Sequence, residues 1–104
     1  MSVLMTLRAP ADVAKFEKLA IDDPAIFTGI LRRAKERGLI SHRFWASDTE
    51  IFVVDEWLNE EAFNGFFQTT PEIQQLMQRA GVTAPPQVSF WRSADTRDEY
   101  PPAR

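Results

Sequence analysis

The fold of this 104-residue chain is decided by the segment ISHRFWA-SDTE-IFVVDEW, residues 40–57. Two runs rich in aromatic and β-branched residues, Ile40–Ala46 and Ile51–Trp57, flank the polar residues Ser47–Glu50. Aromatic and β-branched residues favour strands, and a short polar segment between two such runs favours a turn. The segment therefore predicts a β-hairpin near the middle of the chain.

The residues before the hairpin predict one strand and a helix in two parts. Val3–Arg8 is apolar with little alternation, which is typical of a strand buried on both faces. Asp12 is a suitable N-cap for a first helix. Asp23 and Pro24 restart a second helix as N-cap and first helical residue, and Gly38 ends it.

The residues after the hairpin repeat this arrangement. Asn59 is placed to cap a third helix, and Thr70-Pro71 begins a fourth helix that ends at Gly81. Gln87–Arg92 predicts the last strand. The order predicts an α+β, ferredoxin-like split βαβ fold with a four-stranded antiparallel sheet and helices on one face. Residues 1–92 form this domain, and residues 93–104 form a polar C-terminal tail.

The strands carry large apolar side chains on both faces. Adjacent residues of a strand point to opposite faces. Three such apolar pairs are Phe44 and Trp45, Phe52 and Val53, and Phe90 and Trp91. Because the helices cover only one face, we expect a second copy of the sheet to cover the other and form a homodimer.

The composition excludes several kinds of chemistry. The chain has no Cys, so it offers no disulfide, thiolate metal site or thiol nucleophile, and its single His excludes a multi-histidine metal site within one chain. Its isolated glycines form no phosphate-binding loop. The net charge of −3 argues against nucleic acid as a partner. No apolar run is long enough for a membrane span or a signal peptide, so we expect a cytoplasmic protein. Because the residues that usually hold metals and phosphate-bearing cofactors are missing, we also expect that it needs no metal or cofactor.

His42 is the one side chain suited to acid–base chemistry at neutral pH. If the hairpin loop has an even number of residues, His42 faces Asp55 across the two strands. A carboxylate beside an imidazole would hold its tautomer, as in a positioned general base. An odd loop places Val54 opposite His42 instead. The alternative interpretation of the pair is an ion pair at a strand end.

A second group of candidates could line a pocket for a flat aromatic ligand, because large aromatic and thioether side chains offer apolar, adaptable surfaces. The alternative role of these residues is packing in the core or in a dimer. They are Trp45, Trp57, Phe63, Phe66, Phe67 and Met77.

The strand end Asp55-Glu56-Trp57, followed by the helix start Asn59-Glu60-Glu61-Ala62-Phe63, resembles the antibiotic-biosynthesis monooxygenase (ABM) superfamily. The resemblance covers about residues 3–92. It implies two ferredoxin-like protomers packed sheet against sheet into a dimeric α/β barrel, with a pocket between the helices and the sheet of each. Some members of this superfamily oxidise polycyclic phenols or quinols with molecular oxygen and without metal or flavin, and others bind and degrade haem.

The haem-degrading branch is not expected, because three of its features are missing. Phe66 stands where that branch has Trp, and Leu76 stands where it has an iron-ligating His. The neighbourhood of Thr6 lacks the Asn of its first strand.

Two functions therefore stay open. One is a cofactor-independent monooxygenase acting on a small aromatic or quinol-like substrate, with His42 as the base and Asp55 orienting it. The other is a non-enzymatic module of the same fold that binds a small apolar molecule or a partner chain.

Overall fold

The computed structural model describes residues 1–102, which contain four strands and four helices. Their order and bounds are β1 (Val3–Pro10), α1 (Val13–Asp22), α2 (Pro24–Glu36), β2 (Leu39–Ala46), β3 (Glu50–Trp57), α3 (Glu60–Thr69), α4 (Glu72–Arg79) and β4 (Gln87–Trp91).

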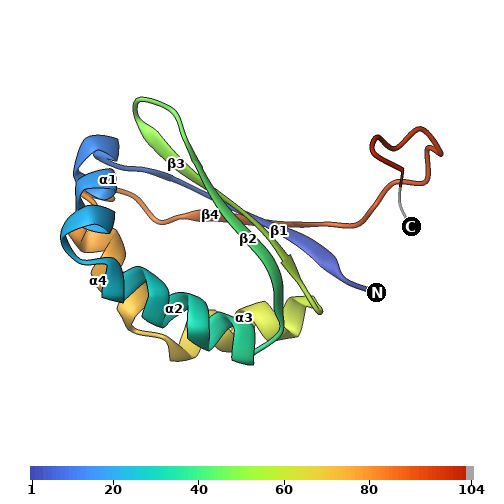
Figure 1. Cartoon of the computed structure of the whole chain (residues 1–104), viewed down its shortest axis with the longest axis horizontal. Coiled ribbons are helices and arrows are strands. Elements are labelled where there is room, and N and C mark those ends of the chain that lie inside the picture. The colour runs from blue at the N-terminus through green and yellow to red at the C-terminus, as the bar shows by residue number, and fades with distance from the viewer. Residues whose placement is uncertain (103–104) are drawn as a thin grey trace.

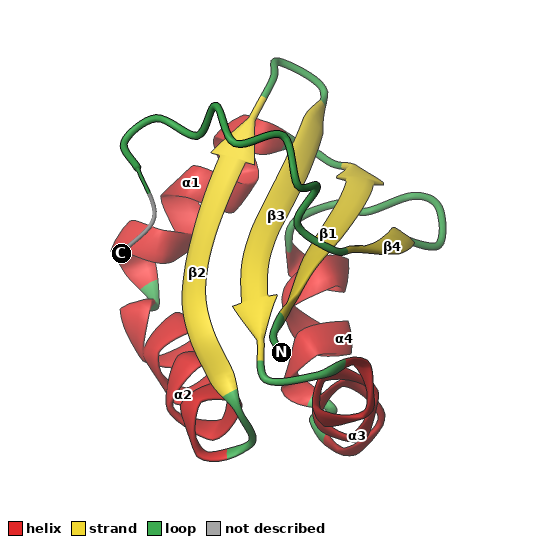
Figure 2. Cartoon of the chain, turned by 90° about the vertical axis from the view of Figure 1, so that its right-hand side faces the viewer, coloured by secondary structure: helices red, strands yellow, loops and turns green. Residues whose placement is uncertain are grey.

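The strands form one antiparallel sheet in the order β2-β3-β1-β4. The helices lie together on one side of this sheet (Figure 1). Seen from the end of the molecule, the sheet stands in front of the helical layer, with β2 and β4 as its two edges (Figure 2). This is the predicted α+β, ferredoxin-like fold.

Local hydrogen bonds account for the starts of α1 and α3. The Asp12 carboxylate accepts from the Lys15 amide at 3.1 Å, and the Asn59 side chain accepts from the Ala62 amide at 2.8 Å, as the sequence predicts. Asp23 does occupy the N-cap position of α2, but its side chain makes no cap. It accepts instead from Arg79 at 2.8 Å, so it joins the start of α2 to the end of α4.

The hairpin has the register predicted for an even loop. Ala46 pairs with Ile51, Phe44 with Val53, and His42 with Asp55. The Ser47 hydroxyl accepts from the Glu50 amide at 3.1 Å, and the Ser47 amide donates to the Glu50 carbonyl at 3.0 Å. These bonds close the turn and thereby fix which residues of β2 and β3 share a face.

The core lies between the sheet and the helices, and Trp57 is at its centre. Its side chain is fully buried, with ring centroids 5.5 Å from Phe63 and 5.2 Å from Phe66 on α3. A second aromatic group joins Phe16 of α1 to Phe44 of β2 at 5.0 Å, edge to face. The burial of aromatic rings in these geometries holds α1 and α3 against the sheet.

The other face of the sheet is uncovered in the single chain. Met5, Leu7 and Ala9 of β1 are buried, whereas Leu4 is 40% exposed. The prediction that this strand is buried on both faces is therefore wrong for one protomer, because every helix lies on one side.

The chain continues past β4 without helix or strand through residues 93–102, and this segment projects away from the sheet (Figure 1). The predicted tail extends to residue 104, so its residues 103–104 lie outside the described residues. None of the helices within residues 1–102 is long and apolar enough to cross a membrane.

An ion pair on the uncovered face links β1 to β3. Arg8 donates to both carboxylate oxygens of Glu50, at 2.7 and 3.1 Å. These hydrogen bonds lower the pKa of Glu50 from its ordinary value of 4.5. The pair therefore contributes stability above that value, and the contribution is lost as the pH falls through the lowered pKa of the folded state.

We predict that Arg8→Gln raises the pKa of Glu50 towards its ordinary value, because the substitution removes the guanidinium that stabilises the carboxylate. A carboxyl-detected NMR titration measures this directly. Arg92→Gln, which changes an arginine bonded to the Ser93 carbonyl, is the matched control and leaves the Glu50 titration unchanged. An unchanged Glu50 titration in Arg8→Gln would contradict the assignment.

Candidate functional site

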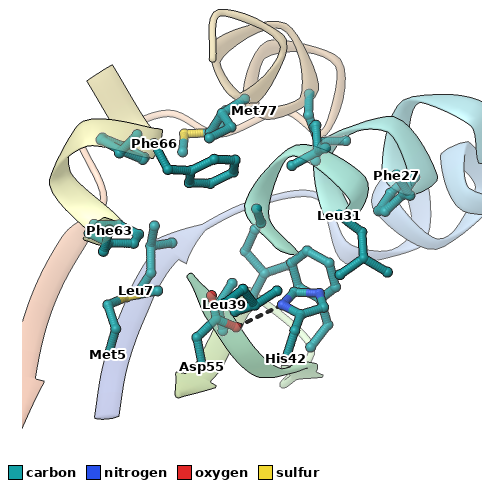
Figure 3. A pocket seen from close by; sticks show the side chains of 18 of the residues that line it. Met5, Leu7, Phe27, Leu31, Leu39, His42, Asp55, Phe63, Phe66 and Met77 are labelled. Carbon is teal, nitrogen blue, oxygen red and sulfur yellow. Dashed lines mark hydrogen bonds and ion pairs between the residues drawn. The ribbon is translucent and has the colours of Figure 1, made fainter. Parts of the chain in front are cut away.

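A cavity of about 240 Å³ lies between the sheet and the helical layer. Strands β1, β2 and β3 supply its floor, and all four helices contribute to its walls and roof. Figure 3 shows His42 and Asp55 on the sheet side, with Phe63, Phe66 and Met77 on the helical side. The cavity thus occupies the interior of a single protomer.

The cavity opens between α2 and β2. Among its lining residues, those exposed to solvent are Thr28 and Leu31 of α2 and His42 of β2. The lining residues from β1, β3, α3 and α4 are buried or half-buried. His42 therefore stands at the mouth, where its side chain is 26% exposed, and the wall opposite is closed.

Asp55 holds the imidazole of His42 in place. The carboxylate lies 2.7 Å from Nδ1 of His42 through Oδ1, and its Oδ2 accepts from Nε1 of Trp57 at 3.1 Å. The Asp55 side chain is 7% exposed and Trp57 is fully buried. A charged group at such a site is retained when each of its oxygens has a donor, and both oxygens of Asp55 have one.

This geometry assigns the proton of the imidazole. A carboxylate only accepts hydrogen bonds, so Nδ1 of His42 donates and carries a proton. In the neutral ring the lone pair is then on Nε2. Nε2 has no hydrogen-bond partner within residues 1–102, and the ring lines the cavity. The arrangement can accept a proton from a molecule bound there.

The remaining surface of the cavity is almost entirely apolar. Four of the residues predicted to form a pocket line it from α3 and α4: Phe63, Phe66, Phe67 and Met77. Phe63 and Phe67 stack with their centroids 5.4 Å apart, and Met77 is buried. These side chains offer a flat ligand a wall of rings and a polarisable thioether.

Trp45 and Trp57 do not line the cavity, so their prediction as pocket residues is corrected. Trp45 follows Phe44 on β2 and points to the uncovered face, where it is 55% exposed and lies under the guanidinium of Arg43. Trp57 shares the inner face with Asp55 but is enclosed by α3. Its contribution to the site is the hydrogen bond to Asp55.

Helix α2 also contributes to the cavity, which its sequence does not reveal. Phe27, Ile30 and Leu31 of this helix line the cavity beside its mouth. Their spacing along a helix gives an apolar stripe, which indicates a buried face but not a cavity beneath it. Only the packing of α2 over the edge strand β2 shows that part of this stripe faces a cavity.

Of the three positions that distinguish this chain from the haem-degrading branch, two lie in the cavity and one lies on the uncovered face. Phe66 and Leu76 line the cavity with carbon side chains alone, which cannot ligate iron. Thr6 lies on the uncovered face, where its hydroxyl accepts from Nε1 of Trp91 at 2.9 Å.

We predict that Asp55→Leu lowers the free energy of unfolding by about 1–3 kcal/mol, because it leaves the buried Nε1–H of Trp57 without an acceptor. Urea denaturation measures the loss. Trp57→Phe removes that donor, so adding it to Asp55→Leu costs less than adding it to the wild type. Additive losses in this double-mutant cycle would show that the two side chains are not coupled.

Comparison by sequence identifies no relative: no family model matches the chain, and no curated protein matches it. Comparison by structure finds many similar folds. These similar structures include three of monooxygenases or oxygenases.

ActVA-Orf6 of Streptomyces coelicolor, a monooxygenase solved in complex with the ligand nanaomycin D, has a TM-score of 0.66 at 23% identity, covering 89% of each chain. SnoaB from Streptomyces nogalater, a cofactor-independent oxygenase, has a TM-score of 0.61 at 16% identity, covering 94% of this chain and 97% of its own. A putative antibiotic biosynthesis monooxygenase from Nitrosomonas europaea has a TM-score of 0.64 at 9% identity, covering 91% of this chain and 92% of its own. The chain has the same ferredoxin-like α+β fold as these three proteins.

Proposed function

We propose that this protein is a cofactor-independent monooxygenase that acts on a small aromatic or quinol-like substrate. The observation that carries the proposal is Nε2 of His42, which has no hydrogen-bond partner within residues 1–102 and stands at the mouth of an apolar cavity, while Asp55 holds Nδ1. The monooxygenases of the same fold support the reaction class.

The chemistry needs only a base and a dry pocket. Nε2 of His42 accepts the proton of a phenolic hydroxyl, and Asp55 stabilises the imidazolium that forms. The phenolate is electron-rich enough to pass an electron to dioxygen. The two radicals combine at a ring carbon, and the imidazolium of His42 returns its proton to the resulting peroxide. Loss of water from this hydroperoxide gives a quinone and leaves His42 neutral again. With 1-naphthol the balance is naphthol plus O₂ giving naphthoquinone plus H₂O.

The apolar walls serve this chemistry in two ways. They bind the ring system through burial, which is favourable in proportion to the apolar area removed from water. They also exclude water from the phenolate and from the reactive intermediate. Phe63, Phe66 and Phe67 supply this surface from α3.

We predict that the wild type consumes oxygen with at least one member of a panel of naphthols, anthrones and quinols. His42→Ala lowers the rate by about 10²–10⁴-fold, as expected when a general base is removed. An oxygen electrode measures the rate, with product identified by absorbance. Ser41→Ala is the matched control, because Ser41 precedes His42 on β2 and faces the opposite side of the sheet.

Equal rates in the wild type and His42→Ala would remove His42 from the mechanism. Binding of these compounds without oxygen uptake would favour a non-enzymatic binding module of the same fold.

We further propose that the functional unit is a homodimer in which a second copy covers the free face of the sheet. Leu4, Trp45, Phe52 and Trp91 are 40%, 55%, 37% and 55% exposed on that face. An apolar surface shared by four neighbouring strands is typical of an interface between protein chains. Sheet-to-sheet packing would bury these side chains against their equivalents.

We predict that Phe52→Glu gives a monomer of 11.9 kDa in sedimentation velocity at micromolar concentration, whereas the wild type sediments with twice that mass. A carboxylate that loses its hydration at an apolar interface opposes association. Ile21→Glu is the matched control, because Ile21 is 79% exposed on α1, in the helical layer on the opposite side of the sheet. A wild type that sediments as a monomer would contradict the proposal.

A further inference from the structure

The polar groups of the cavity leave one atom free to recognise a ligand. Its lining residues are apolar except Thr28, His42 and Asp55. The Thr28 hydroxyl lies 3.3 Å from the carbonyl oxygens of Pro24 and Ala25 in its own helix. Both oxygens of Asp55 are bonded, and Nδ1 of His42 is bonded to one of them. Nε2 of His42 remains.

The free atom lies at one end of the cavity. His42 is at the mouth with Thr28 and Leu31, whereas Phe66 and Met77 on the helical side are buried. A ligand hydroxyl bonded to Nε2 therefore stays near the opening. The rest of the ligand extends inward among rings, a thioether and aliphatic carbons (Figure 3).

A second polar group at the inner end of a ligand would be buried with no partner. Leaving a neutral hydroxyl unsatisfied in this way weakens binding by about 5- to 150-fold, and a carboxylate is penalised more because it loses its hydration as an ion. The lining contains no Arg or Lys that could compensate a carboxylate. The cavity therefore discriminates against polarity at that end.

The volume of the cavity limits the size of the ligand that it can hold. The cavity measures about 240 Å³, below the range of about 300–1,000 Å³ that is usual for pockets holding drug-sized ligands. A molecule of one or two fused rings matches this space better than a system of four rings.

From these observations we infer that the cavity selects a neutral monohydroxylated aromatic molecule of one or two rings, bound by its hydroxyl to Nε2 of His42. It rejects analogues with a carboxylate or second hydroxyl at the far end. This inference rests on the proposed function in taking the cavity as the substrate site, and it narrows the substrate class to simple monophenols.

The test is a series of matched ligands measured by isothermal titration calorimetry under argon, so that binding is separated from turnover. The ligands are naphthalene, 2-naphthol, 2,6-dihydroxynaphthalene and 6-hydroxy-2-naphthoate. We expect 2-naphthol to bind at least fivefold more tightly than naphthalene and than the diol, and more than tenfold more tightly than the carboxylate.

Two variants assign the selectivity to the cavity. His42→Phe keeps a ring at the mouth but removes Nε2, and Asp55→Leu in the same chain removes the carboxylate that would otherwise be free to accept from the ligand hydroxyl. In this double variant naphthalene and 2-naphthol bind equally well. Ser41→Ala, on the outer side of β2, keeps the order seen in the wild type. Equal affinity of the wild type for 2-naphthol and 6-hydroxy-2-naphthoate, or no binding of any of the four, overturns the inference.

Oxygen uptake with the same ligands separates the two proposals. If the affinities follow the expected order but no phenol causes oxygen uptake, the proposed monooxygenase activity is contradicted and the proposed ligand selectivity stands. Oxygen uptake that is as fast with the carboxylate as with 2-naphthol contradicts the selectivity and leaves the monooxygenase in place.

Discussion

The carboxylate of Asp55 joins the core of this protein to its cavity. One oxygen accepts from the indole of Trp57, which is fully buried, and the other bonds the imidazole of His42 at the cavity mouth. A carboxylate in this position is stable because both oxygens have donors. The same two bonds fix the orientation of His42. Packing around Trp57 therefore determines, through Asp55, how the imidazole meets a bound molecule.

The many aromatic residues of the chain divide between the two faces of the sheet. On the inner face, Trp57 of β3 packs against Phe63 and Phe66 of α3, which also form part of the cavity wall. On the outer face, Trp45 and Trp91 remain exposed beside polar partners. The alternation of a strand is the cause, since each pair of adjacent apolar residues supplies one side chain to each face.

Helix α2 forms one side of the cavity and part of its mouth. Helix α2 has a single buried residue, Ala34, although its apolar stripe faces the interior. The exposed pairs Arg33–Glu72 and Asp23–Arg79 connect this helix and its start to α4. Phe27 and Leu31 line the cavity and its opening, and Phe27 also packs edge to face on Phe16 and Phe44. The result is an apolar interior that opens beside the imidazole of His42.

Local patterns in the sequence determined the elements and their order. Asp12 and Asn59 cap helices, Gly38 and Gly81 adopt positive φ after helices, and the four residues of the turn give the register that pairs His42 with Asp55. Each depends on neighbours within a few residues or on the period of a strand, so the sequence carries the signal.

Only the tertiary structure decided which aromatic residues meet the cavity. Strand alternation from His42 already places Trp45 on the other face, and this signal was available in the sequence. The sequence carried no such signal for two other features. One is the enclosure of Trp57 by α3, and the other is the contribution of α2 to the cavity through Phe27, Ile30 and Leu31. They depend on how far each helix stands from the sheet. That distance is set by the packing of side chains from all the elements at once, which no local pattern records.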